Sequence, residues 1–217
     1  GDGTELAIAE MIRSGTTTFS DMYLFPNVCA AAAQRLGMRC QITFPILDFP
    51  TAWGEDADDY ISKGLALRDD FKHSTLVTVV FGPHAPYTVC EANLAKIATI
   101  AAELDTAIHI HLHETPGEVL QAVEQNGERP LDTLQRLGLL GPRTQCVHMT
   151  DLGEQDIALL AETGTHVVHC PQSNMKLASG TCRVNDLLTR GVNVALGTDS
   201  AASNNELNMF GEMKAAA

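Results

Sequence analysis

The sequence lacks the features expected of a protein that binds nucleic acid or crosses a membrane. Lysine and arginine number 14 against 27 acidic residues, which gives a formal net charge of −13, and no basic stripe offsets that balance. Binding to phosphates needs clustered Lys and Arg, so nucleic acid is not an expected partner. No apolar run is long enough for a bilayer, and no stretch has the basic start and apolar middle of a signal peptide. A membrane is therefore not an expected partner either.

Closely spaced cysteine pairs are also missing. The six cysteines are scattered along the chain, and no two of them form a C-x-x-C pair. Several lie in apolar runs typical of strands or helices. This pattern favours buried thiols in a reducing compartment, and the location we expect is the cytoplasm.

The chain does contain a regular alternation of helical and strand patterns. Strand patterns are found at residues 16–21, 39–47, 76–82, 107–113, 145–148, 166–170 and 192–197. They are apolar on both faces, which is typical of a parallel sheet covered by helices. An open doubly wound sheet would have a Gly-rich phosphate turn after an early strand, and none is present. The predicted fold is therefore α/β, a (β/α)8 TIM-like barrel without its first strand.

We expect residues 1–217 to form one domain. The length allows one sizeable core, and no internal repeat or low-complexity segment divides the chain. Both ends are unusual, because residues 1–4 run directly into one helical pattern and residues 209–214 stop within another. The sequence is thus expected to be a partial barrel domain that lacks the first strand and the C-terminal flank.

Polar and titratable residues gather where the predicted strands end. They are Asp21, His84, His111, His113, Glu114, His148, His169 and Asp199. The carboxyl ends of barrel strands meet at one mouth, where active sites are built. Charged or polar side chains packed into one mouth are hard to explain by stability alone. The functional site is therefore expected at this mouth.

The densest cluster is the segment IHIHLHE at residues 108–114. Alternation along a strand predicts that His109, His111 and His113 share one face. Imidazole is a common Zn²⁺ ligand, and a nearby carboxylate can move protons during hydrolysis. The alternative for each histidine is a hydrogen-bonded residue of the barrel interior. The combination of His111 with Glu114 favours the functional interpretation.

Asp199 and His84 are further candidates. Asp199 ends the last apolar strand, where an aspartate can ligate a metal and accept a proton from water. The alternative is that Asp199 caps a helix or forms an Asx turn. The histidine cluster favours Asp199 as a metal ligand. His84 lies in a loop stiffened by two prolines, where a fixed imidazole can contact a substrate or simply bond to the backbone. Residues 172–176 are expected to be a polar loop in the wall of the same pocket.

Taken together, these motifs resemble the amidohydrolase superfamily. More closely, they are similar to 5-methylthioadenosine/S-adenosylhomocysteine deaminases, in the group that also holds triazine chlorohydrolases and guanine deaminases. The resemblance spans essentially the whole chain, in the family's order: MIRSGTTT at 11–18, FGPHAPY at 81–87, IHLHET at 110–115, CVHM at 146–149, SNMKL at 173–177 and LGTDSAASNN at 196–205. Such a series is far more specific than a lone H-x-H.

The resemblance implies a metal-dependent hydrolytic deaminase, which acts on C–N bonds other than peptide bonds in cyclic amidines. Its implied substrate is a small purine nucleoside (5-methylthioadenosine, S-adenosylhomocysteine or adenosine), and its product is ammonia. It implies His111 and Asp199 as ligands of one ion of zinc, or of another divalent metal, per site. Glu114 would hold the purine ring and shuttle a proton, Asp199 would accept a proton from water, and His84 would contact the nucleoside. Whether the protein is a homo-oligomer is left open.

The sequence departs from the family's pattern around the metal site. The first-strand H-x-H pair, which supplies two further metal ligands, has no counterpart in this sequence. The family's sixth-strand histidine falls on Gln145, and strand alternation predicts that His148 lies on the opposite face from Gln145. Two alternatives therefore stay open. One is hydrolysis of another amino- or chloro-heterocycle of the guanine or triazine type, and the other is a catalytically inactive barrel remnant.

Overall fold

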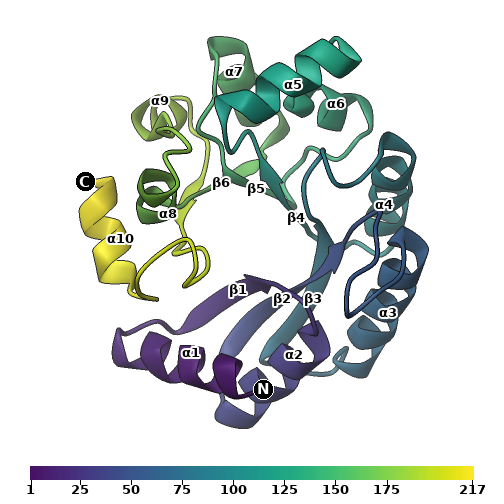
Figure 1. The fold of residues 1–217 in the computed structure, drawn as a ribbon, viewed down its shortest axis with the longest axis vertical. Coiled ribbons are helices and arrows are strands. Elements are labelled where there is room, and N and C mark those ends of the chain that lie inside the picture. Colours follow the sequence, from purple (N-terminus) through teal and green to yellow (C-terminus); the bar gives the residue numbers. More distant parts are fainter.

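The structure, a computed structural model that describes residues 1–217, is built around seven parallel strands. These are β1 (Thr18–Met22), β2 (Arg39–Ile46), β3 (Val77–Pro83), β4 (Ile108–Leu112), β5 (Thr144–His148), β6 (His166–His169) and β7 (Val194–Leu196). Their order in the sheet is their order in the sequence, and β7 does not pair with β1. Figure 1 shows the strands around a common centre with helices outside. The predicted partial (β/α)8 barrel is confirmed.

Helices connect the strands and cover the outside of the sheet (Figure 1). They are α1 (Asp2–Arg13), α2 (Pro26–Leu36), α3 (Ala57–Asp70), α4 (Glu91–Glu103), α5 (Pro116–Asn126), α6 (Pro130–Arg136), α7 (Glu154–Thr163), α8 (Pro171–Lys176), α9 (Val184–Thr189) and α10 (Met209–Ala216). Proline occupies the first helical position of α2, α5, α6 and α8, where its missing N–H costs no hydrogen bond. No helix combines the length and the apolar character needed to cross a membrane.

The prediction of a loop at residues 172–176 is wrong, because these residues belong to α8. The helix is too short for a 3.6-residue periodicity to show in the sequence. Its first residue, Pro171, follows β6 almost directly, so α8 begins at the carboxyl end of that strand. The helix therefore lies at the mouth of the barrel, where it contributes Ser173 and Asn174 to the site.

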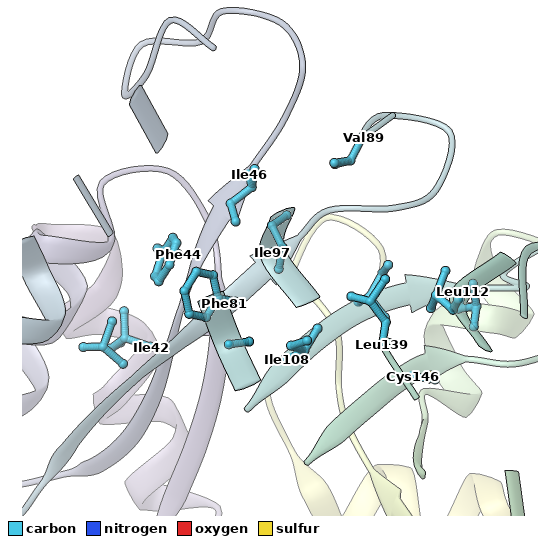
Figure 2. Packing of buried hydrophobic residues seen from close by; sticks show 14 of the residues in the cluster. Ile42, Phe44, Ile46, Phe81, Val89, Ile97, Ile108, Leu112, Leu139 and Cys146 are labelled. Atoms are coloured by element: carbon cyan, nitrogen blue, oxygen red, sulfur yellow. The ribbon is translucent and has the colours of Figure 1, made fainter. Parts of the chain in front are cut away.

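The hydrophobic core lies between the sheet and the surrounding helices. On β2, Ile42, Phe44 and Ile46 alternate with inward-facing residues and are fully buried. The ring of Phe44 packs against that of Phe81 on β3, with centroids 4.9 Å apart (Figure 2). Gly64 of α3 lies directly over Phe44, so close contact between helix and sheet depends on the absence of a side chain there.

The inner face of the sheet carries several polar side chains, so the expectation of strands apolar on both faces is wrong at these positions. Gln41 on β2 and Gln145 on β5 exchange two hydrogen bonds, of 2.9 and 3.2 Å. These strands are not neighbours in the sheet, so the bonds cross the barrel interior. Ser20 of β1 accepts a bond of 3.0 Å from Gln41 and lies 3.4 Å from Nδ1 of His109. The apolar runs hid this pattern because β-branched and aromatic residues surround these few polar side chains.

We expect Gly64→Ala to destabilise the fold, although alanine is the better helix former by about 1 kcal/mol. An ideal Cβ at this position would lie 2.2 Å from the Phe44 ring. Overpacking a filled core typically costs about 1–3 kcal/mol, and we expect a loss of that size in the free energy of unfolding, measured by urea denaturation. Gly117→Ala in α5 is the control, because a Cβ there meets only Thr115 Oγ1 at 3.7 Å. Equal losses in both variants would contradict the packing explanation.

Candidate active site

The strands β4, β5 and β7 all end in left-handed backbone turns at the mouth of the barrel. His113 after β4 has φ 49°, His148 at the end of β5 has φ 79°, and Asp199 after β7 has φ 57°. Residues other than glycine rarely adopt such angles, and each costs about 1–3 kcal/mol unless its surroundings hold it in place. Strain of this kind concentrates at functional sites. The turns therefore mark the mouth as a candidate site on structural grounds.

His111 points into the mouth from β4 with a fixed tautomer. Its Nδ1 lies 2.7 Å from the backbone oxygen of His84. A carbonyl only accepts, so Nδ1 carries the proton and Nε2 keeps a lone pair. Burial, followed by the nearby charge of His148, lowers the pKa of His111. The ring is thus neutral at pH 7 and presents a nitrogen lone pair.

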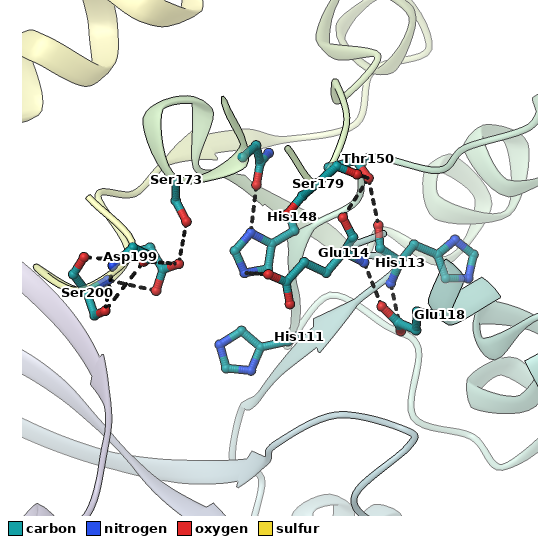
Figure 3. A network of polar contacts seen from close by, with 12 residues as sticks. His111, His113, Glu114, Glu118, His148, Thr150, Ser173, Ser179, Asp199 and Ser200 are labelled. Atoms are coloured by element: carbon teal, nitrogen blue, oxygen red, sulfur yellow. Dashed lines mark hydrogen bonds and ion pairs between the residues drawn. The ribbon is translucent and has the colours of Figure 1, made fainter. Parts of the chain in front are cut away.

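Asp199 faces the same space from the end of β7 (Figure 3). Its Oδ2 accepts hydrogen bonds from the hydroxyls of Ser173 at 2.6 Å and Ser203 at 2.7 Å, and its Oδ1 accepts one from the Ser200 N–H at 2.7 Å. Burial opposes ionisation of Asp199, but these bonds outweigh it and lower the pKa. The carboxylate also offsets part of the effect of burial on the pKa of His111. The two side chains thus lie at one mouth, as predicted.

The two residues fit part of a zinc site. No three His, Cys, Asp or Glu side chains in the chain lie close enough together to hold a metal ion. An imidazole nitrogen and a carboxylate oxygen are both ordinary zinc ligands. A carbonyl bonded to the other ring nitrogen, as on His111, is the usual second contact of a metal-binding histidine. Their role as ligands stays a prediction.

Glu114 and His148 complete the group around the mouth (Figure 3). His148 stacks on His111, with ring centroids 5.6 Å apart and planes at 24°. Its Nδ1 lies 2.9 Å from Oδ1 of Asn174 on α8, and its Nε2 lies 3.9 Å from Oε1 of Glu114. A ring that donates from Nδ1 to the amide oxygen keeps a lone pair on Nε2. The mouth therefore holds a carboxylate and an imidazole beside the two candidate ligands.

His84 lies beside this group in the loop after β3. Its ring centroid is 5.1 Å from that of His111, and its Nδ1 is 3.0 Å from Oγ1 of Thr88. Burial, and then the neighbouring His111, lowers the pKa of His84 to about 4. A neutral, partly exposed imidazole at this place can exchange hydrogen bonds with a ligand. Its contact with a nucleoside stays a prediction.

Comparison with known proteins identifies the family. The profile of the Amidohydrolase family matches residues 2–217. The chain belongs to the amidohydrolase family. It is 57% identical over 216 residues to a 5-methylthioadenosine/S-adenosylhomocysteine deaminase of Teredinibacter turnerae, covering 100% of the chain and 49% of that protein. The corresponding protein of Saccharophagus degradans is also 57% identical, with 99% and 48% covered.

Solved structures agree with this membership. An adenosine deaminase from Xanthomonas campestris with bound zinc matches with a TM-score of 0.97 and 48% identity, covering 99% of the chain and 49% of that structure. A guanine deaminase from C. acetobutylicum with bound guanine matches with a TM-score of 0.89 at 20% identity, covering 99% and 54%, and shows the fold alone. The chain thus spans about half the length of the relatives it matches.

His148 corrects an expectation based on strand alternation. The alternation places it on the opposite face from Gln145, and so away from the interior. The positive φ of His148 breaks the alternation at the last residue of β5 and turns the ring into the mouth. Gln145 stays below, where it bonds to Gln41. In this amidohydrolase chain it is therefore His148, and not Gln145, that lies beside His111.

His113 corrects a second expectation, that it shares a face with His109 and His111. The strand ends at Leu112, and the left-handed turn at His113 aims its ring away from the mouth (Figure 3). The buried ring has its Nδ1 2.8 Å from the Asp151 oxygen and accepts a bond of 3.2 Å at Nε2 from the Leu131 N–H. Both nitrogens have partners, so the alternative of a structural histidine holds here.

The remaining strand-end residues have local partners. Burial raises the pKa of the Asp21 carboxyl, and the Cys29 thiol of α2 partly opposes this rise. Nδ1 of His169 lies 3.5 Å from Nδ2 of Asn174, the residue whose amide oxygen contacts His148. Asp21 thus has Cys29 of α2 as its neighbour, while His169 helps to fix the amide that orients His148.

Glu118 at the start of α5 is a half-buried carboxylate that was not among the predicted site residues. Its Oε1 accepts the His113 N–H at 3.1 Å, and its Oε2 accepts the Glu114 N–H at 2.7 Å. Burial raises its pKa to about 7, against the opposing effect of these bonds. The pattern Thr115-x-x-Glu118 was visible as a capping box, but nothing in it showed that the carboxylate reaches beyond the helix.

We expect Glu118 to make the fold less stable as the pH rises through 7. Its pKa in the folded chain, about 7, lies above the ordinary 4.5, so the folded state binds the proton more tightly than the unfolded state. That contribution to stability is complete below the unfolded value and is lost as the pH rises through the folded value. The free energy of unfolding in urea should therefore fall less between about pH 5 and about pH 8 in Glu118→Gln than in the wild type. An equal fall in the free energy of unfolding in the two proteins would contradict the raised pKa of Glu118.

Proposed function

We propose that the protein that carries this chain is a zinc-dependent hydrolytic deaminase of an adenine nucleoside. The candidate substrates are 5-methylthioadenosine, S-adenosylhomocysteine and adenosine, and residues 1–217 would form part of the catalytic barrel domain. The observation that carries the proposal is the convergence of His111, Glu114, His148 and Asp199 at one mouth. The identity to deaminases along the whole chain supports the choice of substrate class. A cytoplasmic location is supported by six unpaired cysteines, five of them buried.

The proposed zinc ion would be held by Nε2 of His111 and the carboxylate of Asp199, together with the H-x-H pair that the resemblance assigns to the family's first strand. Bound zinc lowers the pKa of water from ~16 toward ~7, which makes hydroxide accessible at neutral pH. The hydrogen bonds that keep Asp199 ionised also keep it competent to accept a proton. Asp199 would take the proton of the attacking water as the new C–O bond forms at the carbon that bears the amine.

Glu114, in its protonated form, would protonate the adjacent ring nitrogen, and Asp199 would pass the proton taken from water to the amine, so that the C–N bond breaks with release of ammonia. The proton left on the new hydroxyl group would return to Glu114 as the C=O bond forms. The lone pair on Nε2 of His148 lies next to this carboxylate and opposite His111. We assign to His148 the role of orienting the attacking water, which the resemblance implies for the family's sixth-strand histidine, the residue that falls on Gln145 in this sequence. His84, at the rim, would contact the nucleoside.

Replacing Glu114 by glutamine should lower kcat for ammonia release by about 100-fold or more, because the amide cannot donate the required proton. Zinc content should not change, since Glu114 is not a proposed ligand. The measurement is ammonia release by the full-length protein with each adenine nucleoside, and Glu124→Gln on the exposed side of α5 is the matched control. Near-normal turnover by the Glu114 variant would rule out its proton role. Ammonia from guanine, or chloride from a chlorotriazine, in preference to ammonia from adenine nucleosides would overturn the substrate class.

Removing either proposed ligand should release the metal. In the full-length protein, His111→Ala and Asp199→Ala should each lower the zinc retained after dialysis by about tenfold or more, measured by elemental analysis. His73→Ala should retain the metal, because His73 is exposed and lies in the turn before β3, at the amino end of that strand and not at the mouth. Residues 1–217 alone should bind zinc weakly and show little activity. Full zinc occupancy in the His111 variant would show that the ligand assignment is wrong.

A further inference from the structure

We propose that Glu118 and Thr150 are positioning residues for Glu114, and that they do so by holding its backbone from both sides. The carboxylate of Glu118 binds the peptide N–H on one side of Glu114, and the hydroxyl of Thr150 binds the carbonyl on the other. The inference rests on the proposed role of Glu114, which it deepens. It assigns a function to two residues that touch no reacting atom.

The Glu118 carboxylate is directed at the turn before its helix. Thr115 is the N-cap of α5, and its Oγ1 already accepts the Glu118 N–H at 3.1 Å. In an ordinary capping box the glutamate at this position returns to the N–H of the N-cap residue itself. Here it passes Thr115 and accepts the N–H groups of His113 and Glu114 instead. The helix start is thus capped by Thr115, while the Glu118 carboxylate serves the strand-to-helix turn.

Thr150 holds the same turn from the loop after β5. Its Oγ1 lies 2.7 Å from the Glu114 oxygen, closer than to the oxygens of His113 at 3.3 Å and Ser179 at 3.2 Å. Its own N–H donates to the His113 oxygen at 2.9 Å. Gly180 packs against this side chain, and a Cβ there would lie 2.9 Å from Oγ1. The hydroxyl is therefore buried, confined and aimed at the peptide of Glu114 (Figure 3).

These contacts matter because the turn is strained. His113 is left-handed, so the direction in which Glu114 leaves the strand depends on bonds from outside the turn. Thr150 is two residues from His148, which is also left-handed and faces Glu114. One hydroxyl thus joins the turn that carries the carboxylate to the turn that carries the imidazole. Misplacing a proton-transfer group by about 1 Å can cost about 100-fold in rate.

A half-buried carboxylate is also costly to keep for capping alone. Burial outweighs the two N–H bonds of Glu118, so its charged form is unfavourable at this place. A neutral cap would avoid that cost. The competing explanation, that Glu118 only stabilises α5, predicts a loss of stability on substitution with no specific loss of turnover.

The first test is Glu118→Gln in the full-length protein loaded with zinc. The carboxamide has nearly the same size but only one acceptor oxygen, so one of the two N–H groups loses its partner. We expect kcat to fall by about 10- to 100-fold while KM changes by about threefold or less, with zinc content and circular dichroism unchanged. Glu124→Gln, on the same helix and exposed, should behave as wild type. Unchanged kcat in a folded Glu118 variant would overturn the proposal.

The second test is a double-mutant cycle with Glu114→Gln. If Glu118 acts through Glu114, adding Glu118→Gln to the Glu114 variant should lower kcat by about twofold or less. A further loss as large as in the wild-type background would show a separate structural effect and overturn the proposal. Near-normal activity of Glu114→Gln alone would overturn the proposed function of Glu114 and this inference with it. An inactive Glu114 variant together with a fully active Glu118 variant would overturn this inference only.

Thr150→Val tests the other side of the turn, and decides the matter if the Glu118 variant does not fold. Valine has nearly the shape of threonine and replaces the hydroxyl with a methyl group, which cannot donate to the Glu114 oxygen. We expect about tenfold lower kcat with zinc retained, and again little further effect in the Glu114→Gln background. A folded Thr150 variant with wild-type kcat would contradict the role of Thr150.

Discussion

The parallel order of the seven strands is the constraint on which the site depends. Because every neighbouring pair is parallel, the carboxyl ends of β3, β4, β5 and β7 meet at one mouth. Residues as far apart in sequence as His84, His111 and Asp199 are therefore brought to one place by the sheet itself. The polar bonds across the interior, such as Gln41 to Gln145, lie below that mouth and tie strands that are not neighbours. Fold and site thus follow from the same register.

The sequence alone was sufficient to predict those features that depend on hydrophobic alternation and on the order of the motifs. The alternation of helices and strands, the partial barrel and the inward direction of His111 followed from local patterns. The turns did not. His113 points away from the mouth and His148 into it because each adopts a positive φ, and hydrogen bonds from distant segments hold those angles. Period-two alternation assumes that the strand continues, so it cannot predict turns that depend on such distant bonds.

The same limit explains why the supporting residues were missed. Ser173 and Asn174 lie on α8, a helix too short to recognise, yet one bonds to Asp199 and the other to His148. A single short helix therefore orients both the Asp199 carboxylate, the proposed proton acceptor, and the imidazole of His148. The turn at Glu114 is held in a comparable way from α5 and from the loop after β5. In each case a strained turn is stabilised by polar groups outside it, which is how preorganised sites are generally supported.

His84 shows how one residue can serve two roles without conflict. Its backbone oxygen fixes the tautomer of His111, so that contact does not depend on the identity of its side chain. Its imidazole remains available at the rim, where burial keeps it neutral. The backbone of His84 must be rigid if its oxygen is to stay in place while its side chain contacts other groups. Two features of the loop restrict this backbone. Proline stands on either side, at positions 83 and 86, and Thr88 bonds both to the His84 ring and to the backbone of Ala85. The candidate metal ligand is therefore oriented by the main chain of His84, and the imidazole of His84 is not needed for that contact.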